Sequence, residues 1–431
     1  MNDFSNRRLS PGLQNVAWIV CTVGLLVTSP RALGTLPISD EDLSSVGMNR
    51  YWTASLPIPE GELVASISFV EDSLYATTTD GLIFSLRADA GLIRWVEQVS
   101  SPNVPILQPT HIWTPDGKGP VSIVSGENLT VIDRYNGLVL QEVDLSSYEV
   151  TGNIVGALRS FFFCTRDQLA YSYRLDRDGA FRKRWEVHTY GTSLTPPVLF
   201  GDKQVLLTNN KGLIAACSAV DKTLSWHFKA SDGIEGTPAV NDSGVYVASK
   251  DRSLYKLDGR SGRLLWRVRF PSTLVQGPAV TANSAYQYSS RDGLTAIDVA
   301  SGKRLWNEKE ATEFVAESGG KAVVAVGDSR LSLYDIVSGK PGGEIPLLAP
   351  SIFAVNTAND AVFICSLDGT LTCVRPNGVP YLRYAQGKEA ADNLNVPPQD
   401  AQPKGDTSDT EASSTPDARS SDFFRSRKDR N

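Results

Sequence analysis

The chain has 431 residues, of which 41% are hydrophobic, and its formal charge at pH 7 is 42 − 48 = −6. A hydrophobic content of this size supports a large buried core, so the sequence predicts a globular protein. Because lysine and arginine form no long basic face before the last few residues, the sequence does not indicate a nucleic-acid partner.

The first 34 residues are typical of a secretory signal peptide. Two arginines precede an apolar run over residues 16–27, and small residues occupy positions −3 and −1 of a cut after Gly34. A helix of this length rises only about 18 Å, less than the hydrocarbon core of about 30 Å. Residues 1–34 are therefore predicted to be a signal peptide, with an uncleaved anchor as the alternative, and residues 35–47 a linker. No integral membrane span is expected after cleavage.

A sequence pattern that contains a glycine turn and usually ends in tryptophan recurs along most of the chain. In three successive copies the tryptophans, Trp226, Trp266 and Trp306, lie 40 residues apart. A period near 40 residues is typical of propellers and solenoids. The eight copies span residues 80–95, 127–141, 167–185, 211–226, 251–266, 292–306, 328–343 and 368–382.

Each copy belongs to a unit of four short apolar runs separated by polar or glycine turns. In one unit these include "GVYVAS" (244–249) and "RLLWRVRF" (263–270), both rich in residues that favour strands. No stripe with a helical period occurs between residues 62 and 384, so helical repeats are disfavoured. Four short strands cannot bury both faces alone, but stacking the sheets around an axis covers them. The fold predicted for residues 48–385 is an all-β, eight-bladed propeller of four-stranded antiparallel blades.

A large aromatic residue recurs in the last run of most units. Burying such a side chain between blades contributes roughly 2 to 3 kcal/mol. The predicted docking tryptophans are Trp52, Trp95, Trp185, Trp226, Trp266 and Trp306, and Gln141 and Gly343 occupy the same position in two weaker copies. Gly262, Gly302 and Gly339 fall in the turn before the last run, where a positive φ is predicted.

The two ends of the repeat region suggest how the ring closes. Trp52 lies in a fourth-strand-like segment with no inner strands before it, so this segment is predicted to complete the last blade beside "GVPYLRY" (378–384). A plain lead-in segment is the alternative. Residues 386–431 are polar and rich in Pro, Ser and Asp, which predicts a disordered tail. Its end at 423–430 is either a short docking or membrane-surface motif or a solvated terminus.

Chemically reactive side chains are few and scattered. They include Cys164, Cys217, Cys365 and Cys373 outside the signal, and His111, His188 and His227. Four cysteines are too few for a disulfide scaffold, and Cys365 and Cys373 either face each other across a hairpin or are buried thiols. The histidines lack metal-ligand spacing, and no nucleophile elbow, P-loop or His-Glu-x-x-His motif occurs. No catalytic residue and no metal site are predicted.

Turns between second and third strands share one face of a propeller with the connections between blades. Asp and Arg recur in these loops, and loops on a rigid scaffold are the usual place for function. The predicted partner-binding residues are Asp251, Arg252, Arg291, Asp292, Asp328, Arg330, His188 and Tyr190. Such a surface suits a protein or an acidic ligand, and solvated hairpin turns are the alternative interpretation.

The repeat resembles the pyrroloquinoline-quinone-like (PQQ-like) propeller repeat. The resemblance is carried by "LYKLDGRSGRLLW" (254–266), by "AIDVASGKRLW" (296–306) and by the strand starts at Pro238 and Pro278. The resemblance covers roughly residues 62–384 and implies eight blades of four strands. Two branches share this architecture. The quinoprotein dehydrogenases hold PQQ and Ca²⁺ in an axial pocket, commonly beside a vicinal disulfide, and the non-catalytic BamB-like branch binds partner proteins through loops at one face.

The resemblance favours the non-catalytic branch for this chain. The sequence has no adjacent cysteine pair and no long insertions between blades, and "DRDG" (176–179) lacks the later acidic residues of a calcium loop. The expected protein is a monomeric scaffold without a cofactor, exported to the periplasm or outer envelope of a Gram-negative-type bacterium, where it binds a protein. A PQQ-dependent dehydrogenase and a binder of envelope glycans or polymers are the alternatives.

Overall fold

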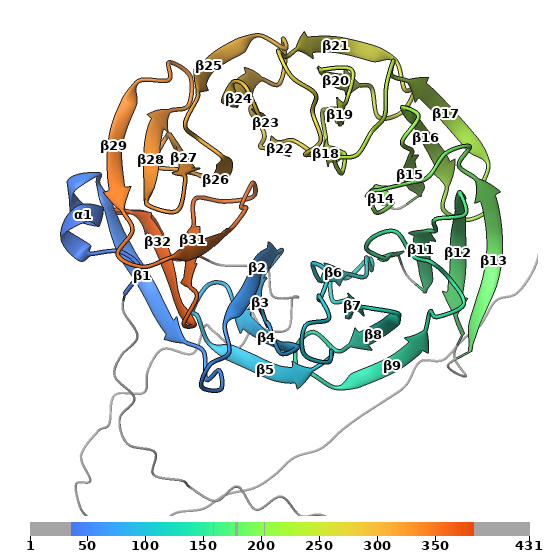
Figure 1. The fold of residues 1–431 in the computed structure, drawn as a ribbon, viewed down its shortest axis with the longest axis horizontal. Helices are drawn as coiled ribbons and strands as arrows, with labels where there is room; N and C mark the ends of the chain where they lie inside the picture. The colour runs from blue at the N-terminus through green and yellow to red at the C-terminus, as the bar shows by residue number, and fades with distance from the viewer. Residues whose placement is uncertain (1–35, 158, 177–179, 202, 383–431) are drawn as a thin grey trace, which may run out of the picture. The chain divides into compact units, whose positions relative to one another are not determined.

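The computed structural model describes residues 36–157, 159–176, 180–201 and 203–382. They form eight four-stranded antiparallel sheets around a common axis (Figure 1). The predicted all-β, eight-bladed propeller is confirmed. The predicted signal peptide (1–34) and polar tail (386–431) lie outside the described residues.

Each of the first four blades is a consecutive run of strands, with its first strand nearest the axis and its fourth at the circumference (Figure 1). Blade one contains β2 (Val64–Val70), β3 (Ser73–Thr78), β4 (Leu82–Arg87) and β5 (Ile93–Gln98). Blade two contains β6 (Thr110–His111), β7 (Val121–Ser125), β8 (Asn128–Ile132) and β9 (Val139–Asp144). Blade three contains β10 (Val155–Ala157), β11 (Ser160–Cys164), β12 (Leu169–Leu175) and β13 (Phe181–His188). Blade four contains β14 (Val198–Phe200), β15 (Gln204–Thr208), β16 (Leu213–Ser218) and β17 (Leu224–Lys229).

The last four blades repeat this order, except that the eighth borrows its outer strand from the N-terminal side. Blade five contains β18 (Ala239–Asn241), β19 (Gly244–Ser249), β20 (Ser253–Leu257) and β21 (Leu264–Arg269). Blade six contains β22 (Ala279–Val280), β23 (Ser284–Ser289), β24 (Gly293–Asp298) and β25 (Arg304–Glu308). Blade seven contains β26 (Glu313–Ser318), β27 (Lys321–Val326), β28 (Arg330–Asp335) and β29 (Pro341–Pro346). Blade eight contains β30 (Ser351–Ala354), β31 (Val362–Ser366), β32 (Thr370–Pro376) and β1 (Met48–Ser55).

Strand β1 closes the ring as the outer strand of blade eight. It pairs antiparallel with β32, and Trp52 lies opposite Cys373. The predicted partner segment at 378–384 is wrong, because the third strand of this blade ends at Pro376 and β1 already occupies the outer position. Residues after the strand instead pack near β1, where the Tyr381 ring lies 6.1 Å from that of Tyr51.

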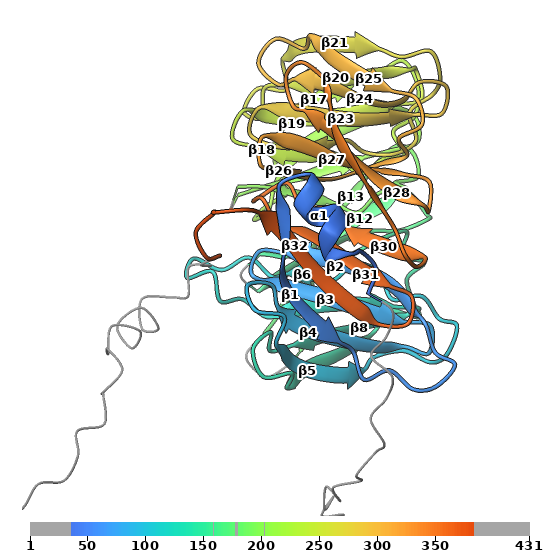
Figure 2. The ribbon, with the colours of Figure 1, turned by 90° about the vertical axis from the view of Figure 1, so that its left-hand side faces the viewer.

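The segment predicted as a linker (35–47) contains a short helix, α1 (Asp40–Ser45), which lies beside β1 and β29 (Figure 1 and Figure 2). Ser39 caps the helix by accepting a hydrogen bond from the backbone N–H of Asp42 at 3.1 Å. The side chain of Leu43 is fully buried in a cluster with residues of blades seven and eight. These residues therefore cover the outside of a blade seam instead of spanning solvent.

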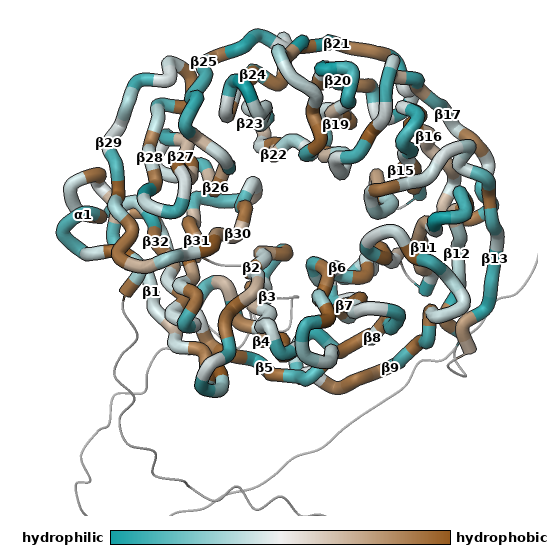
Figure 3. Tube along the Cα trace, viewed as in Figure 1, coloured by the Kyte–Doolittle hydropathy of each residue, from teal (hydrophilic) through white to brown (hydrophobic). Residues whose placement is uncertain are grey.

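The hydrophobic core is divided into clusters that join neighbouring blades. In one of them Leu206 and Ile214 of blade four contact Val245 and Tyr255 of blade five. Figure 3 shows hydrophobic segments recurring in the strands around the ring. Because each sheet buries apolar surface against two neighbours, the closed ring leaves no blade with an uncovered face.

Five of the predicted docking tryptophans contact the next blade in the same way. Each indole N–H donates to a backbone carbonyl that lies three residues before a turn residue with positive φ. The pairs are Trp52 with Ala88 at 3.1 Å, and Trp95 with Arg134, Trp226 with Gly259, Trp266 with Val299 and Trp306 with Ile336, each at 2.9 Å.

The turn glycines make room for these rings. Gly262, Gly302 and Gly339 have φ values of 69°, 73° and 66°. A Cβ atom built on them would lie 2.5, 2.8 and 2.4 Å from the nearest ring or Cβ atom of the tryptophan in the preceding blade. Glycine is therefore required both by the left-handed backbone and by the closeness of the indole.

Candidate binding surface and blade-seam groove

The loops predicted to bind a partner are held against one another. We call the turns between second and third strands, together with the connections between blades, the loop face. In blade four the backbone N–H of Asn210 donates to the carbonyl of Thr192 at 2.8 Å, and the amide of Asn209 donates to the carbonyl of Thr189 at 2.6 Å. In blade five the N–H of Lys250 donates to the carbonyl of Gly233 at 2.8 Å. These bonds fix the turns to the connections that precede them.

The Asp251 carboxylate forms its contacts within the protein. Its side chain is only 6% exposed, and it accepts hydrogen bonds from the backbone N–H of Ser231, at 3.0 Å, and from the Tyr255 hydroxyl. The Arg267 guanidinium lies 3.8 Å away. This carboxylate therefore holds the connection between blades four and five in place.

Arg252 and Arg291 are exposed basic residues of the loop face in blades five and six. Within the described ranges, neither guanidinium has a hydrogen bond or an ion pair to the protein. Arg252 also has a positive φ of 67°, a conformation that costs energy for a residue with a side chain. The neighbouring Asp292 lies 3.5 Å from Arg304 and not against Arg291.

The predicted residues of blade seven have different environments. Arg330 forms ion pairs with Glu310 at 2.6 Å and Glu344 at 3.4 Å, so its charge is balanced within the protein. Asp328 is exposed and lines a hollow of about 330 Å³ near the axis, beside β2, β26 and β30. Of these two residues, Asp328 is the one presented to solvent.

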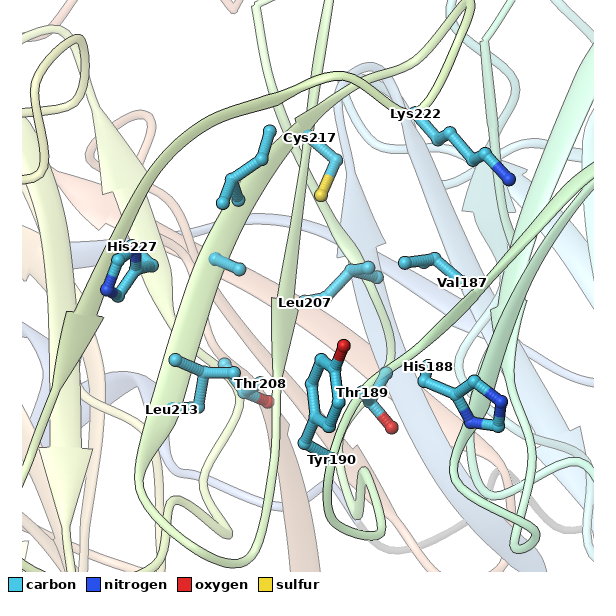
Figure 4. Close-up of a pocket in the computed structure, with 12 residues that line it drawn as sticks. Val187, His188, Thr189, Tyr190, Leu207, Thr208, Leu213, Cys217, Lys222 and His227 are labelled. Carbon is cyan, nitrogen blue, oxygen red and sulfur yellow. The ribbon is translucent and has the colours of Figure 1, made fainter.

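His188 and Tyr190 line a different feature, a groove between blades three and four. The groove has a volume of about 370 Å³ and lies between β13 and the strands β16 and β17 (Figure 4). Figure 4 shows the Tyr190 ring rising into the groove, whereas the His188 ring points away from it. Its lining also includes Val187, Thr189, Leu207, Thr208, Leu213, Ala215, Cys217, Lys222, Leu224 and His227.

A charged cluster that sequence reasoning missed joins blades one and two. Glu71 lies 2.9 Å from Nδ1 of the buried His111 and 2.7 Å from the buried Arg134, and the Tyr75 hydroxyl lies 2.8 Å from Nε2 of His111. The hydrogen bond from His111, followed by the charges of His111 and Arg134, lowers the pKa of Glu71 to about 2. These residues are up to 63 positions apart in sequence, and only the register of two blades brings them together.

The four cysteines of the described ranges are free and buried. Cys365 and Cys373 are not partners across the hairpin, because they lie opposite Leu371 and Phe363. Burial raises the pKa of Cys365 to about 12 and that of Cys164 to about 11. The thiols therefore stay protonated at neutral pH and act as small apolar side chains.

The quinoprotein alternative implies a site for a calcium ion. Such a site needs several oxygen ligands converging on a hard cation. No group of three or more His, Cys, Asp or Glu side chains is arranged to hold a metal in the part that the structure describes. Among the same residues, no helix is long and apolar enough to cross a membrane.

The fold and its docking tryptophans define a class of protein. It is the eight-bladed propeller in which a tryptophan of one blade packs against a turn of the next blade. A family model described as outer membrane protein assembly factor BamB matches residues 173–312 and 210–377. Residues 173–377 are therefore similar in sequence to this family of PQQ-like repeat β-propellers. The resemblance inferred from the repeat is thereby confirmed.

Solved structures share this fold at low sequence identity. BamB from Moraxella catarrhalis is 16% identical over 78% of this chain and 99% of its own, with a TM-score of 0.61. The computationally designed Ika8 protein (13% identity, 74% and 98% coverage, TM-score 0.52) and the C-terminal WD40 domain of Sif2 (13%, 77% and 98%, 0.53) are also similar. No curated protein matches the chain in sequence.

Proposed function

We propose that the chain is a non-catalytic scaffold that binds a partner protein through its loop face in a bacterial cell envelope. Two exposed arginines, Arg252 and Arg291, carry this proposal. Both lie on turns of a rigid ring, and neither forms an ion pair within the described residues. Rigid loops with unpaired charged side chains are suited to recognition. The match to the BamB family model supports the same class of function.

The partner surface should be acidic where it meets these loops. Arg252 and Arg291 follow each other in adjacent blades, and the neighbouring carboxylates, Asp251 and Asp292, contact other side chains. An acidic patch on the partner would therefore find uncompensated positive charge at this part of the face. The apolar run within residues 1–34 supports export as the route to the envelope.

A photo-crosslinking experiment in cells of the source organism tests the proposal. A photoreactive amino acid replaces Arg252 or Arg291 in the full chain, and Arg260 serves as the matched control. Arg260 is an exposed arginine of the same blade as Arg252, in the turn between the third and fourth strands. We expect the same protein adduct from the two loop-face positions and none from Arg260.

Two results would contradict the scaffold function. One is a preparation that contains one PQQ and one Ca²⁺ per chain and oxidises alcohols, which would place the chain in the dehydrogenase branch. The other is an adduct that contains glycan and no protein, which would favour a binder of envelope polymers.

A further inference from the structure

The groove between blades three and four lacks two aromatic side chains that fill the next seam. The two blades can be aligned through their tryptophans, because Trp226 pairs with Ala216 and Trp266 pairs with Lys256. Ala215 and Tyr255 each precede these partners by one residue, so the two positions correspond. Val187 corresponds to Phe228, since each follows its blade's tryptophan by two residues. Between blades four and five, the Phe228 and Tyr255 rings fill the space with their centroids 5.1 Å apart.

The turn of blade four also departs from the docking pattern. Lys222, with a φ of 59°, stands where the other turns that receive a tryptophan have glycine. In those turns a Cβ atom would come within 2.4 to 2.8 Å of the tryptophan of the preceding blade. The Cβ of Lys222 therefore prevents Trp185 from occupying the usual position against its turn.

Trp185 has lost the hydrogen bond that its equivalents make. Its side chain is 6% exposed, yet its indole N–H has no partner among the residues that the structure describes. By the spacing of the other five pairs, the expected acceptor is the carbonyl of Ala219, three residues before Lys222. A buried N–H without a partner costs stability, so this seam is less complete than its neighbours.

The groove is apolar along its length and has a cation at one end. Leu213, Ala215 and Cys217 of β16 line one wall, because alternate residues of a strand share a face. At the end of this row the Lys222 ammonium donates to the carbonyl of Glu186 at 3.2 Å. It forms no ion pair with any described carboxylate.

The segment that supplies the groove's lining is rich in basic residues, and apolar side chains lie at the groove's opening. Residues 181–229 contain seven Lys or Arg and three Asp or Glu, a net charge of 7 − 3 = +4 in a chain of −6. Tyr190 and Leu224 line the groove and are 74% and 54% exposed. Exposed aromatic and leucine side chains around a concave site are typical of protein contacts.

We propose that this groove binds an extended, acidic segment of a partner protein. The segment inserts one large apolar side chain between Val187 and Ala215, in the space that Phe228 and Tyr255 fill at the next seam. An Asp or Glu beside that side chain pairs with Lys222. The charge of the surrounding residues selects an acidic segment over a basic one. This inference rests on the proposed function, since it supplies a second contact for the same partner.

Selection from a random dodecapeptide library tests the groove directly. The target is the full chain, and the matched variant is Val187→Phe with Ala215→Tyr, which restores the aromatic pair of the next seam. We expect selected peptides to contain Phe, Trp or Leu next to Asp or Glu, and their synthetic forms to bind the double variant at least about tenfold more weakly.

Two further variants test the charge at the groove. Lys222→Glu lies at the surface and should weaken binding of the selected peptides about three- to tenfold without filling the groove. Arg260→Ala, in the turn between the third and fourth strands of blade five, should leave peptide binding unchanged. If the double variant does not fold, the Lys222→Glu measurement still decides the proposal.

Several results would overturn the proposal. These are equal binding of the peptides to the Val187→Phe, Ala215→Tyr variant, enriched peptides without acidic residues, or saturable binding of decanoate to the groove when no peptide is enriched. The proposed function is judged separately. If the double variant still forms the loop-face crosslink while the peptides fail, the scaffold function stands and the groove proposal does not.

Discussion

The turn glycines and the tryptophans in front of them act as matched pairs, and each pair joins two blades. At Gly302 both the positive φ of 73° and a distance of 2.8 Å from a new Cβ to the Trp266 ring exclude a side chain. Gly320 has a similar φ of 75° but nothing within 4 Å of the Cβ position. Comparing the two positions separates backbone strain from the clash with the indole.

We expect Gly302→Ala to lower the free energy of unfolding by about 2 to 4 kcal/mol, the sum of left-handed strain and overpacking. Gly320→Ala should cost only about 1 kcal/mol, since it adds strain alone. Urea denaturation of the two variants measures the difference. Equal losses would show that the indole does not depend on the turn glycine.

Replacing Lys222 by glycine should raise the stability of the protein, the opposite effect to Gly302→Ala. Lys222→Gly removes a side chain from a left-handed position and lets Trp185 reach the carbonyl of Ala219, so the free energy of unfolding should rise by about 1 kcal/mol. Lys340→Gly is the control, because Lys340 lies in the corresponding turn of blade seven without a positive φ. That change should lower stability. A fall in stability for Lys222→Gly would contradict the account of this seam.

At the level of strands and turns, the cluster of Glu71, His111 and Arg134 ties blade one to blade two. Since the folded pKa of Glu71 is lowered to about 2 from about 4.5, the carboxylate stabilises the fold above the higher value. This contribution should be lost as the pH falls from about 4.5 towards 2. Tyr75, Asp72 and Arg94 border the same cluster.

The measurement is the free energy of unfolding at pH 5 and at pH 3, for the wild type and for Glu71→Gln. The wild type should lose more stability between the two pH values than the variant, because the variant has no carboxylate to protonate. Because Glu71 is 57% exposed, solvent screens the pair and the difference should be small. Equal losses in both proteins would assign the acid sensitivity to other carboxylates.

The sequence predicts the repeated elements well and the single ones poorly. The number of blades follows from the repeat, because most units contain the same turn and the same docking tryptophan. Helix α1 was missed since six residues are too short to display a helical stripe, although Ser39 followed by three acidic residues is a start signal. The inner partner of β1 was mispredicted, because β1 pairs with β32, which ends at Pro376, and not with the segment that follows Pro376.

The candidate sites are only partly readable for a related reason. The repeat places Asp251 and Arg252 on the loop face, but it does not reveal that Tyr255 and Ser231 use the carboxylate of Asp251. The groove left a signal in the aligned units, where Lys222 replaces glycine and Ala215 stands at the position of Tyr255 in the next unit. A difference between repeats is thus the sequence feature that marks a special seam.

At the scale of the whole molecule, the closed ring keeps the loop face rigid, so recognition depends on side chains more than on loop rearrangement. Reversing the charge of Arg252 and Arg291 together should weaken partner binding at least about tenfold, because two unpaired cations would face an acidic surface with the wrong sign. Arg260→Glu should change binding little. Surface plasmon resonance with the crosslinked partner, once isolated, measures the effect, and equal affinities would remove these loops from the interface.

Native mass spectrometry of the full chain, isolated from its own cells, tests most directly whether the protein binds or catalyses. We expect a species whose mass equals the chain plus one partner protein, with no added mass of a quinone. A chain that carries one PQQ and one Ca²⁺ and has no protein attached would contradict it.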